Sequence, residues 1–130
     1  MLSTAQAAIE TLCQNQFDDY PIIFGNAPFN DQANYNIYYR ATVIFGPGQN
    51  IGLGGMCVRY QSILDFAIFH RPGKGSATAL QKADEVIRFL QNKVFGIYQF
   101  QTSMVRDFAA NERGLVQTLV STNFHFDFRG

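Results

Sequence analysis

The side chains that could perform a reaction are few and lie far apart in this sequence. It contains two cysteines, Cys13 and Cys57, and two histidines, His70 and His125. Cys57 activated by either histidine would be a nucleophile, but such a pair needs a third group that orients the imidazole, and none is identifiable. Neither histidine is spaced from a cysteine or a carboxylate as metal ligands are. The sequence therefore predicts structural roles for both histidines, no enzyme activity, and no metal or cofactor.

A glycine-rich segment at residues 72–76, PGKGS, resembles a phosphate-binding loop only superficially. A P-loop requires Ser or Thr directly after its lysine, but Gly75 follows Lys74, and Ile68 stands where the first glycine belongs. A dinucleotide-binding loop requires a third glycine, but Thr78 occupies that place. The segment is better explained as a flexible turn into a helix capped by Ser76, whose amides could hold an anion weakly.

The charged side chains indicate contact surfaces more than chemistry. Asp18 and Asp19 could act as an acid and a base, but before Tyr20-Pro21 they are better explained as a solvated loop pair. Arginine outnumbers lysine, and its planar guanidinium favours protein interfaces. Ion pairs between protomers, with Asp127 as a further acceptor, are therefore plausible, and simple surface solvation is the alternative. The candidate interface residues are Arg40, Arg59, Asp65, Arg71, Arg106, Asp107, Glu112 and Arg113.

Length and composition favour one globular domain, residues 1–130, that associates with other proteins. The chain of 130 residues has 15% charged and 15% aromatic residues and a formal net charge of zero. This composition argues against disorder and against a broadly basic nucleic-acid binder. A small domain with so many aromatics and so little repulsive charge is expected to bury surface against copies or partners. The alternative is a monomer with an aromatic-rich core.

The cysteine content and the apolar runs bear on the compartment. Two distant cysteines without C-x-x-C spacing indicate a reducing environment. No signal peptide precedes the first predicted helix, and no apolar run is long enough to span a bilayer. We therefore expect a soluble chain made in a cytoplasm, without contact with a membrane.

Hydrophobic periodicity predicts two helices and about five strands. Apolar residues recur at helical spacing over residues 3–16 and 76–90. Alternating or apolar runs predict strands at 22–24, 35–45, 56–70, 97–102 and 115–128, with a bend or bulge in the long 56–70 strand. The expected fold is α+β: a two-layer sandwich with both helices on one face of a mainly antiparallel or mixed sheet.

Of the remaining segments, 46–55 is predicted to be a loop and 103–113 a loop or a strand end. The first is rich in glycine and proline, and we expect both to order when the protein docks on a partner. Its candidate docking residues are Gly46, Pro47, Gly48, Ile51, Leu53 and Gly54.

Several segments, in order, resemble the tail terminators of lambda-like long-tailed phages. They are PIIFGNAPF at residues 21–29, YNIYYRATVIF at 35–45, GPGQNIGLGG at 46–55 and LDFAIFHRPGKGSATALQKADEVIRFLQ at 64–91. The resemblance spans roughly residues 3–128. It implies a virion protein without catalysis or cofactor, assembled in the bacterial host cytoplasm. Such proteins form a hexameric ring on the head-proximal end of the tail tube, stop its growth and present a surface to the head–tail connector or neck, while DNA passes through the ring without sequence-specific binding.

A ring requires a contact between protomers that closes by rotation, and extension of a sheet edge is one way to make it. The long strands 56–70 and 115–128 are the candidates for such edges. Alternative functions are a head–tail joining protein, a tube subunit, a nucleic-acid module that stacks bases on aromatics, or a small enzyme or ligand-binding domain. The last would need a cavity lined by Tyr38, Arg59, Tyr60, Asp65 and His70.

Overall fold

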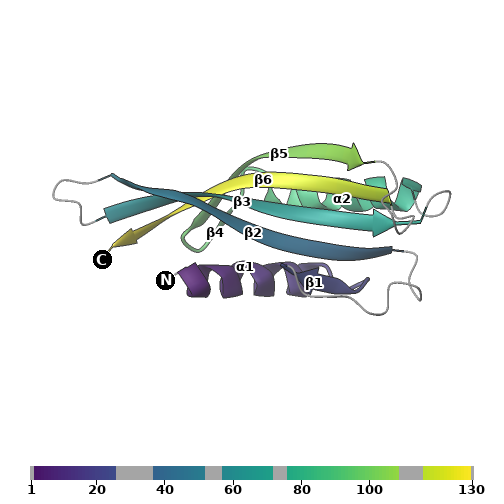
Figure 1. Cartoon of the computed structure of the whole chain (residues 1–130), viewed down its shortest axis with the longest axis horizontal. Helices are drawn as coiled ribbons and strands as arrows, with labels where there is room; N and C mark the ends of the chain where they lie inside the picture. The colour runs from purple at the N-terminus through teal and green to yellow at the C-terminus, as the bar shows by residue number, and fades with distance from the viewer. Residues whose placement is uncertain (1, 26–36, 52–56, 72–75, 109–115, 130) are drawn as a thin grey trace.

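The computed structural model describes residues 2–25, 37–51, 57–71, 76–108 and 116–129. The order of elements is α1 (Leu2–Gln16), β1 (Ile22–Phe24), β2 (Ile37–Asn50), β3 (Cys57–His70), α2 (Ser76–Leu90), β4 (Val94–Phe95), β5 (Tyr98–Phe108) and β6 (Val116–Arg129). All of these strands form one sheet, and both helices pack against it (Figure 1). The predicted α+β fold is confirmed, with six strands in the sheet where about five were expected.

The strand order in the sheet is β1-β2-β3-β6-β5-β4. β1 pairs parallel to β2, and all other neighbours are antiparallel. The two longest predicted strands, β3 and β6, pair with each other along their whole length in the middle of the sheet. The expectation that they offer edges for extension is therefore wrong. The outer strands are β1 and β4, and both are short.

The core lies between the helices and one face of the sheet, the helix face. Because side chains alternate along a strand, every second residue of β2, β3 and β6 points to this face. Tyr39, Phe66 and Phe124 are buried there with the inward residues of both helices. α1 buries Ala5, Ile9 and Cys13, which are four residues apart, and α2 buries Ala79, Ala83, Val86 and Leu90. Leu80, predicted to belong to the α2 stripe, is instead 50% exposed.

Aromatic rings fill much of the core. Phe17 follows α1 and packs its ring against Tyr39, Phe66 and Phe89 with centroid separations of 6.3, 4.9 and 5.6 Å. Phe124 stacks with Phe100 at 4.9 Å at the other end of the sheet. Among the aromatic side chains whose burial the structure describes, Phe128 alone is exposed by more than a third, at 39%. The expectation that the domain cannot hide its aromatics therefore fails for this part of the chain, since the core accommodates them.

Two segments outside the predicted strands belong to strands, so the loop predicted at 46–55 is wrong for residues 46–50. For residues 103–108 the strand end, one of the two predicted alternatives, is confirmed. Residues 46–50 continue β2, and residues 103–108 continue β5. Both continuations follow a shift in pairing register, between Phe45 and Gly48 in β2 and between Phe100 and Ser103 in β5. A bulge inserts extra residues into one strand without ending the pairing. Of the bend or bulge predicted in the 56–70 strand, the bulge is wrong for the described residues, because β3 and β6 pair without a shift.

The β2 bulge explains why glycine and proline are compatible with a strand here. A Cβ added to Gly46 would overlap the carbonyl oxygen of Gln61 on β3, so a side chain does not fit at this position. Pro47 lies within the bulge, where proline is tolerated because the ladder is already interrupted. Pairing resumes at Gly48 opposite Tyr60. Glycine and proline thus mark an irregular strand in this segment.

Candidate functional site

The second face of the sheet, turned away from the helices, carries the candidate charged residues. We call it the open face; it holds the even-numbered residues of β2 up to Ile44 and the odd-numbered residues of β3 and β6. Arg40, Arg59 and Asp65 all lie on it, and so does the exposed Arg106 of β5, whose pairing partner is Leu119. The structure therefore brings four of the eight candidate interface residues to one surface.

Arg59 has an acidic partner within its own chain. Its guanidinium donates two hydrogen bonds to the carboxylate of Asp127, at 2.7 Å from Nε and 3.1 Å from Nη2. This bond lowers the pKa of Asp127 below its ordinary value and raises the pKa of Arg59. The pair joins β3 to β6 across directly opposed positions. Arg59 and Asp127 therefore already have an ion-pair partner within one chain, and Arg59 remains a predicted interface residue.

The other candidates on or near the open face also have contacts in the chain. Asp65 accepts a 2.7 Å hydrogen bond from the hydroxyl of Ser121, and Arg40 donates a 2.6 Å bond to the carbonyl of Gly25. Arg71 follows β3 and is half-buried. Of the remaining candidates, Asp107 lies near the end of β5. Glu112 and Arg113 lie outside the described residues, as do Leu53, Gly54 and most of the glycine-rich segment before α2.

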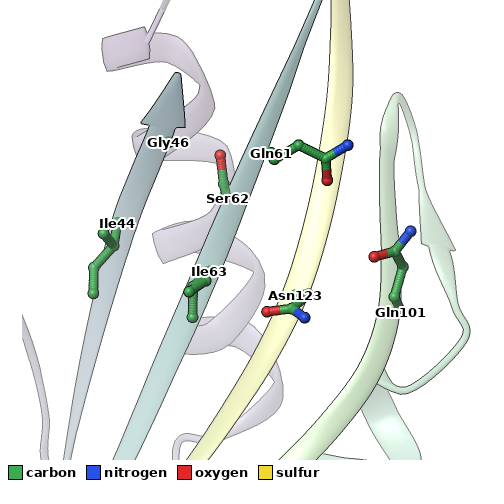
Figure 2. A pocket seen from close by; sticks show the side chains of 7 residues that line it. All are labelled: Ile44, Gly46, Gln61, Ser62, Ile63, Gln101 and Asn123. Atoms are coloured by element: carbon green, nitrogen blue, oxygen red, sulfur yellow. The ribbon is translucent and has the colours of Figure 1, made fainter. Parts of the chain in front are cut away.

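A shallow hollow of about 280 Å³ lies on the open face near the β2 bulge (Figure 2). Four strands contribute to it, with β2 and β3 on one side and β6 and β5 on the other. Its polar side chains are neutral and include three amides, and no ionisable side chain lines it. Acid–base catalysis is therefore not available from its lining, and its chemistry suits hydrogen bonding to another protein. The lining residues are Ile44, Gly46, Gln61, Ser62, Ile63, Gln101 and Asn123.

A second hollow of about 150 Å³ is mainly apolar and lies where α1 meets the start of β5 and the end of β6. Ile97 and Phe128 in its wall are exposed large apolar side chains, at 55% and 39%. An apolar, uncovered surface of this kind is more typical of a protein contact than of a catalytic cleft. The other lining residues are Thr4, Ala5, Tyr98 and Phe126.

The candidate catalytic groups do not come together. Cys57 and His70 occupy opposite ends of β3, 13 residues apart, which corresponds to roughly 40 Å along a strand. His125 lies on the open face and contacts the Gln101 amide at 3.4 Å. Within the described ranges, no cluster of three histidine, cysteine or acidic side chains could bind a metal ion. Burial raises the pKa of Cys13 to about 12, with a smaller contribution from Glu10, so this thiol is unreactive.

The alternative ligand cavity also fails to form from its proposed residues. Tyr38, Arg59 and Asp65 occupy the open face, whereas Tyr60 and His70 point to the helix face. Arg59 and His70 also lie near opposite ends of β3. These five side chains therefore do not converge on one cleft, and the structure argues against this version of a ligand-binding function.

One polar cluster was not predicted from the sequence. Asp19 accepts a 3.1 Å hydrogen bond from the Tyr39 hydroxyl and forms a 2.6 Å ion pair with Lys82, which also contacts Glu85 at 3.2 Å. Burial by itself raises the pKa of Asp19. The hydrogen bond and positive charge of Lys82 and the hydrogen bond from Tyr39 lower it by more, so the pKa lies below its ordinary value. Asp19 is thus a structural link and not half of an acid–base pair. Since its partners are 20 and 63 positions away, no local pattern reveals it.

Together these features describe an α+β fold whose open face and exposed apolar side chains suit contact with other proteins. A family of sequences described as phage tail terminator protein matches residues 3–95. The chain therefore belongs to the phage tail terminator family, a family of tail structural proteins, as the sequence resemblance predicted. Membership places the protein in the virion tail among other tail proteins. No curated protein matches the sequence significantly.

Solved structures confirm the fold independently of the sequence match. One solved chain aligns over 100% of this protein and 98% of its own length, with a TM-score of 0.70 and 17% identity. At this identity the similarity concerns the fold alone. In the part of the chain that the structure describes, neither helix has the length and apolar content needed to cross a membrane.

Proposed function

We propose that this protein forms a closed ring at the head-proximal end of the phage tail tube. The ring, hexameric as the family resemblance implies, ends polymerisation of the tube and provides the surface to which the head–tail connector attaches. Phage DNA passes through its centre without sequence-specific contacts. The observation that carries the proposal is the family match over residues 3–95, because that family takes its name from tail termination.

The surface of the described chain supports an assembly role. Its largely exposed large hydrophobics are mostly aliphatic, and they include Ile44 and Ile63 on the open face and Met104 on β5. A formal net charge of zero adds no repulsion between copies. Within the described ranges, Cys57 and His70 lie at opposite ends of β3 and do not form a catalytic pair. Contacts between copies and with the tube are therefore the function that these features support best.

Electron microscopy of phage particles assembled without this chain tests the proposal. A terminator that stops tube growth leaves overlong, headless tails when it is missing. Tails of normal length without heads would instead identify a head–tail joining protein. The purified chain provides a second test: discrete rings are expected, alone or with tube protein, whereas unlimited tubes would identify a tube subunit and monomers under both conditions would contradict the ring.

A further inference from the structure

We propose that neighbouring copies in the ring pair strand to strand, with the outer edge of β5 in one copy bound antiparallel to β1 of the next. This inference rests on the proposed ring and specifies its contact. It replaces the central strands β3 and β6, which pair with each other along their whole length, by two strands near the edges of the sheet whose outward backbone is unpaired in the described chain.

The free part of the β5 edge begins where β4 ends. β4 pairs with Tyr98 and Gln99. The N–H of Asn92 donates a hydrogen bond to the carbonyl of Gln101, and the N–H of Phe100 donates one to the carbonyl of Lys93. The outer edge of β5 is therefore occupied as far as Gln101. Beyond that point, the outward N–H of Ser103 donates a 3.1 Å bond to the side chain of Gln91. Since strand backbone groups alternate in direction, Val105 and Asp107 also turn their N–H and C=O outward. Within the described ranges, no backbone group pairs with them.

The side chains of this edge do little to prevent pairing. Met104 and Val105 are 53% and 43% exposed and lie on opposite faces of the strand. Residues 102–108 contain neither lysine nor proline, the residues that commonly block exposed edges. The charges of Arg106 and Asp107 cancel. The β5 bulge lies beside β4 and leaves the rest of the strand regular.

β1 offers the matching edge on the other side of the sheet (Figure 1). The carbonyl of Pro21 and the N–H of Gly25 bond to β2, so the backbone groups of Ile22 and Phe24 turn away from β2. No described backbone group bonds to them from outside the sheet. β1 runs parallel to β2, and three antiparallel pairings separate β2 from β5. The two outer strands therefore run in opposite directions.

The register across the sheet places these two edges level with each other. One row of paired residues runs from Phe24 through Ala41, Phe66 and Val120 to Val105. The next outward-facing row runs from Ile22 through Tyr39, Ile68 and Thr118 to Asp107.

A copy placed alongside without sliding therefore sets Phe24 opposite Val105 and Ile22 opposite Asp107. Both are hydrogen-bonded antiparallel pairs. This match between the two edges of one sheet is why we assign the β5 edge to a second copy of the chain and not to an unrelated strand. Because the two edges differ, the contact is head-to-tail, the type that generates a ring when its rotation closes.

Disulfide trapping tests the predicted register. Ile23 and Arg106 would form the non-hydrogen-bonded pair between the two rows, on the open face, with Cβ atoms close enough to bridge. The double variant Ile23→Cys/Arg106→Cys is expected to give covalent oligomers up to the ring size on oxidation, which reductant reverses. Each single variant controls for Cys13 and Cys57, and Ile23→Cys/Met104→Cys, shifted by two residues, is expected to cross-link at least tenfold less.

A proline at Val105 tests the backbone contribution. Val105→Pro removes an outward N–H that bonds to nothing described in its own chain, so the fold is expected to survive while the assembled fraction falls at least tenfold. Val105→Thr keeps the N–H and is expected to assemble normally. If Val105→Pro unfolds, the trapping experiment still decides the register. Rings that form without the 23–106 cross-link would overturn this contact and leave the proposed function standing, whereas a wild-type chain that never forms rings with tube protein would overturn both.

Discussion

At the scale of single residues, the ion pair of Asp19 links the segment after α1 to α2, and its hydrogen bond from Tyr39 links that segment to β2. We expect Asp19→Asn to lower the free energy of unfolding by about 1 kcal/mol at pH 7, because it removes a charge-assisted bond. The loss of stability is small because the Asp19 side chain is 40% exposed and solvent screens its charge. Chemical denaturation measures the loss, and Asp18→Asn, at the adjacent exposed position, is the matched control.

The pH dependence of this difference identifies its cause. Folding lowers the pKa of Asp19, so its contribution is complete above the ordinary aspartate value of about 4 and disappears as the pH falls through the lower folded value. The difference between wild type and Asp19→Asn is therefore expected to persist at pH 5 and to shrink below pH 4. A difference that stays constant through this range would show that the substitution acts through packing and not through charge.

Ser62 provides a second prediction at this scale. Its hydroxyl is buried and has no hydrogen-bond partner within the described chain, although its neighbours are well paired. A buried, unsatisfied hydroxyl destabilises the folded state, so Ser62→Ala is expected to raise the free energy of unfolding by up to about 1 kcal/mol. Ser62→Val occupies more volume and tests whether the site has room. A loss of more than about 1 kcal/mol in Ser62→Ala, measured by denaturation, would show that the hydroxyl has a stabilising partner.

At the scale of elements, the β2 bulge depends on Gly46. Because a Cβ there would overlap the backbone carbonyl of Gln61, Gly46→Ala is expected to cost about 1–3 kcal/mol of stability. Gly96 is the control: its φ of 61° is left-handed but the space around it is open, so Gly96→Asn is expected to cost less than about 1 kcal/mol. Thermal unfolding compares the two variants. Equal stability of Gly46→Ala and wild type would mean that β2 can shift at the bulge.

The helices and the regular parts of the strands were predictable because their signals are local. Ala5, Ile9 and Cys13 repeat at helical spacing, and Thr118, Val120 and Thr122 alternate as a half-buried strand does. Glycine and proline gave a misleading signal at residues 46–50, because a bulge and a loop favour the same residues. The strand order was not predictable, since it follows from pairings between residues far apart in the chain.

The candidate interface residues show the same difference between local signals, which the sequence reveals, and long-range pairings, which it does not. Their residue types were visible in the sequence, but which of them share a surface depends on how four strands align. Arg59 lies 68 positions from Asp127, so the ion pair that occupies its guanidinium appears only when β3 and β6 are paired. The two matched rows that end at Val105 and Asp107 likewise exist only in the assembled sheet. The family resemblance supplied the role of the chain but not these contacts.

At the scale of the whole molecule, the described part of the chain exposes large aliphatic side chains on several elements. Ile44 and Ile63 lie on the open face, Ile97 lies between β4 and β5, and Met104 lies on β5. Contact with a neighbouring copy would remove such side chains from water, which favours association.

The proposed contact makes ring formation insensitive to salt, and this is the last prediction. It consists of backbone hydrogen bonds, and the β1 residues placed opposite Val105, Arg106 and Asp107 are all apolar, so no ion pair joins the two strands. Arg59 and Asp127 are already paired within one chain. Raising the ionic strength from 0.1 to 1 M shortens the screening length from about 10 to 3 Å, which weakens exposed ion pairs but not buried backbone bonds. The concentration at half-assembly, measured by sedimentation with or without tube protein, is therefore expected to change less than about threefold. A tenfold or greater weakening would show that ion pairs between protomers hold the ring, in which case charge reversal at the exposed Arg106 should reproduce it at low salt.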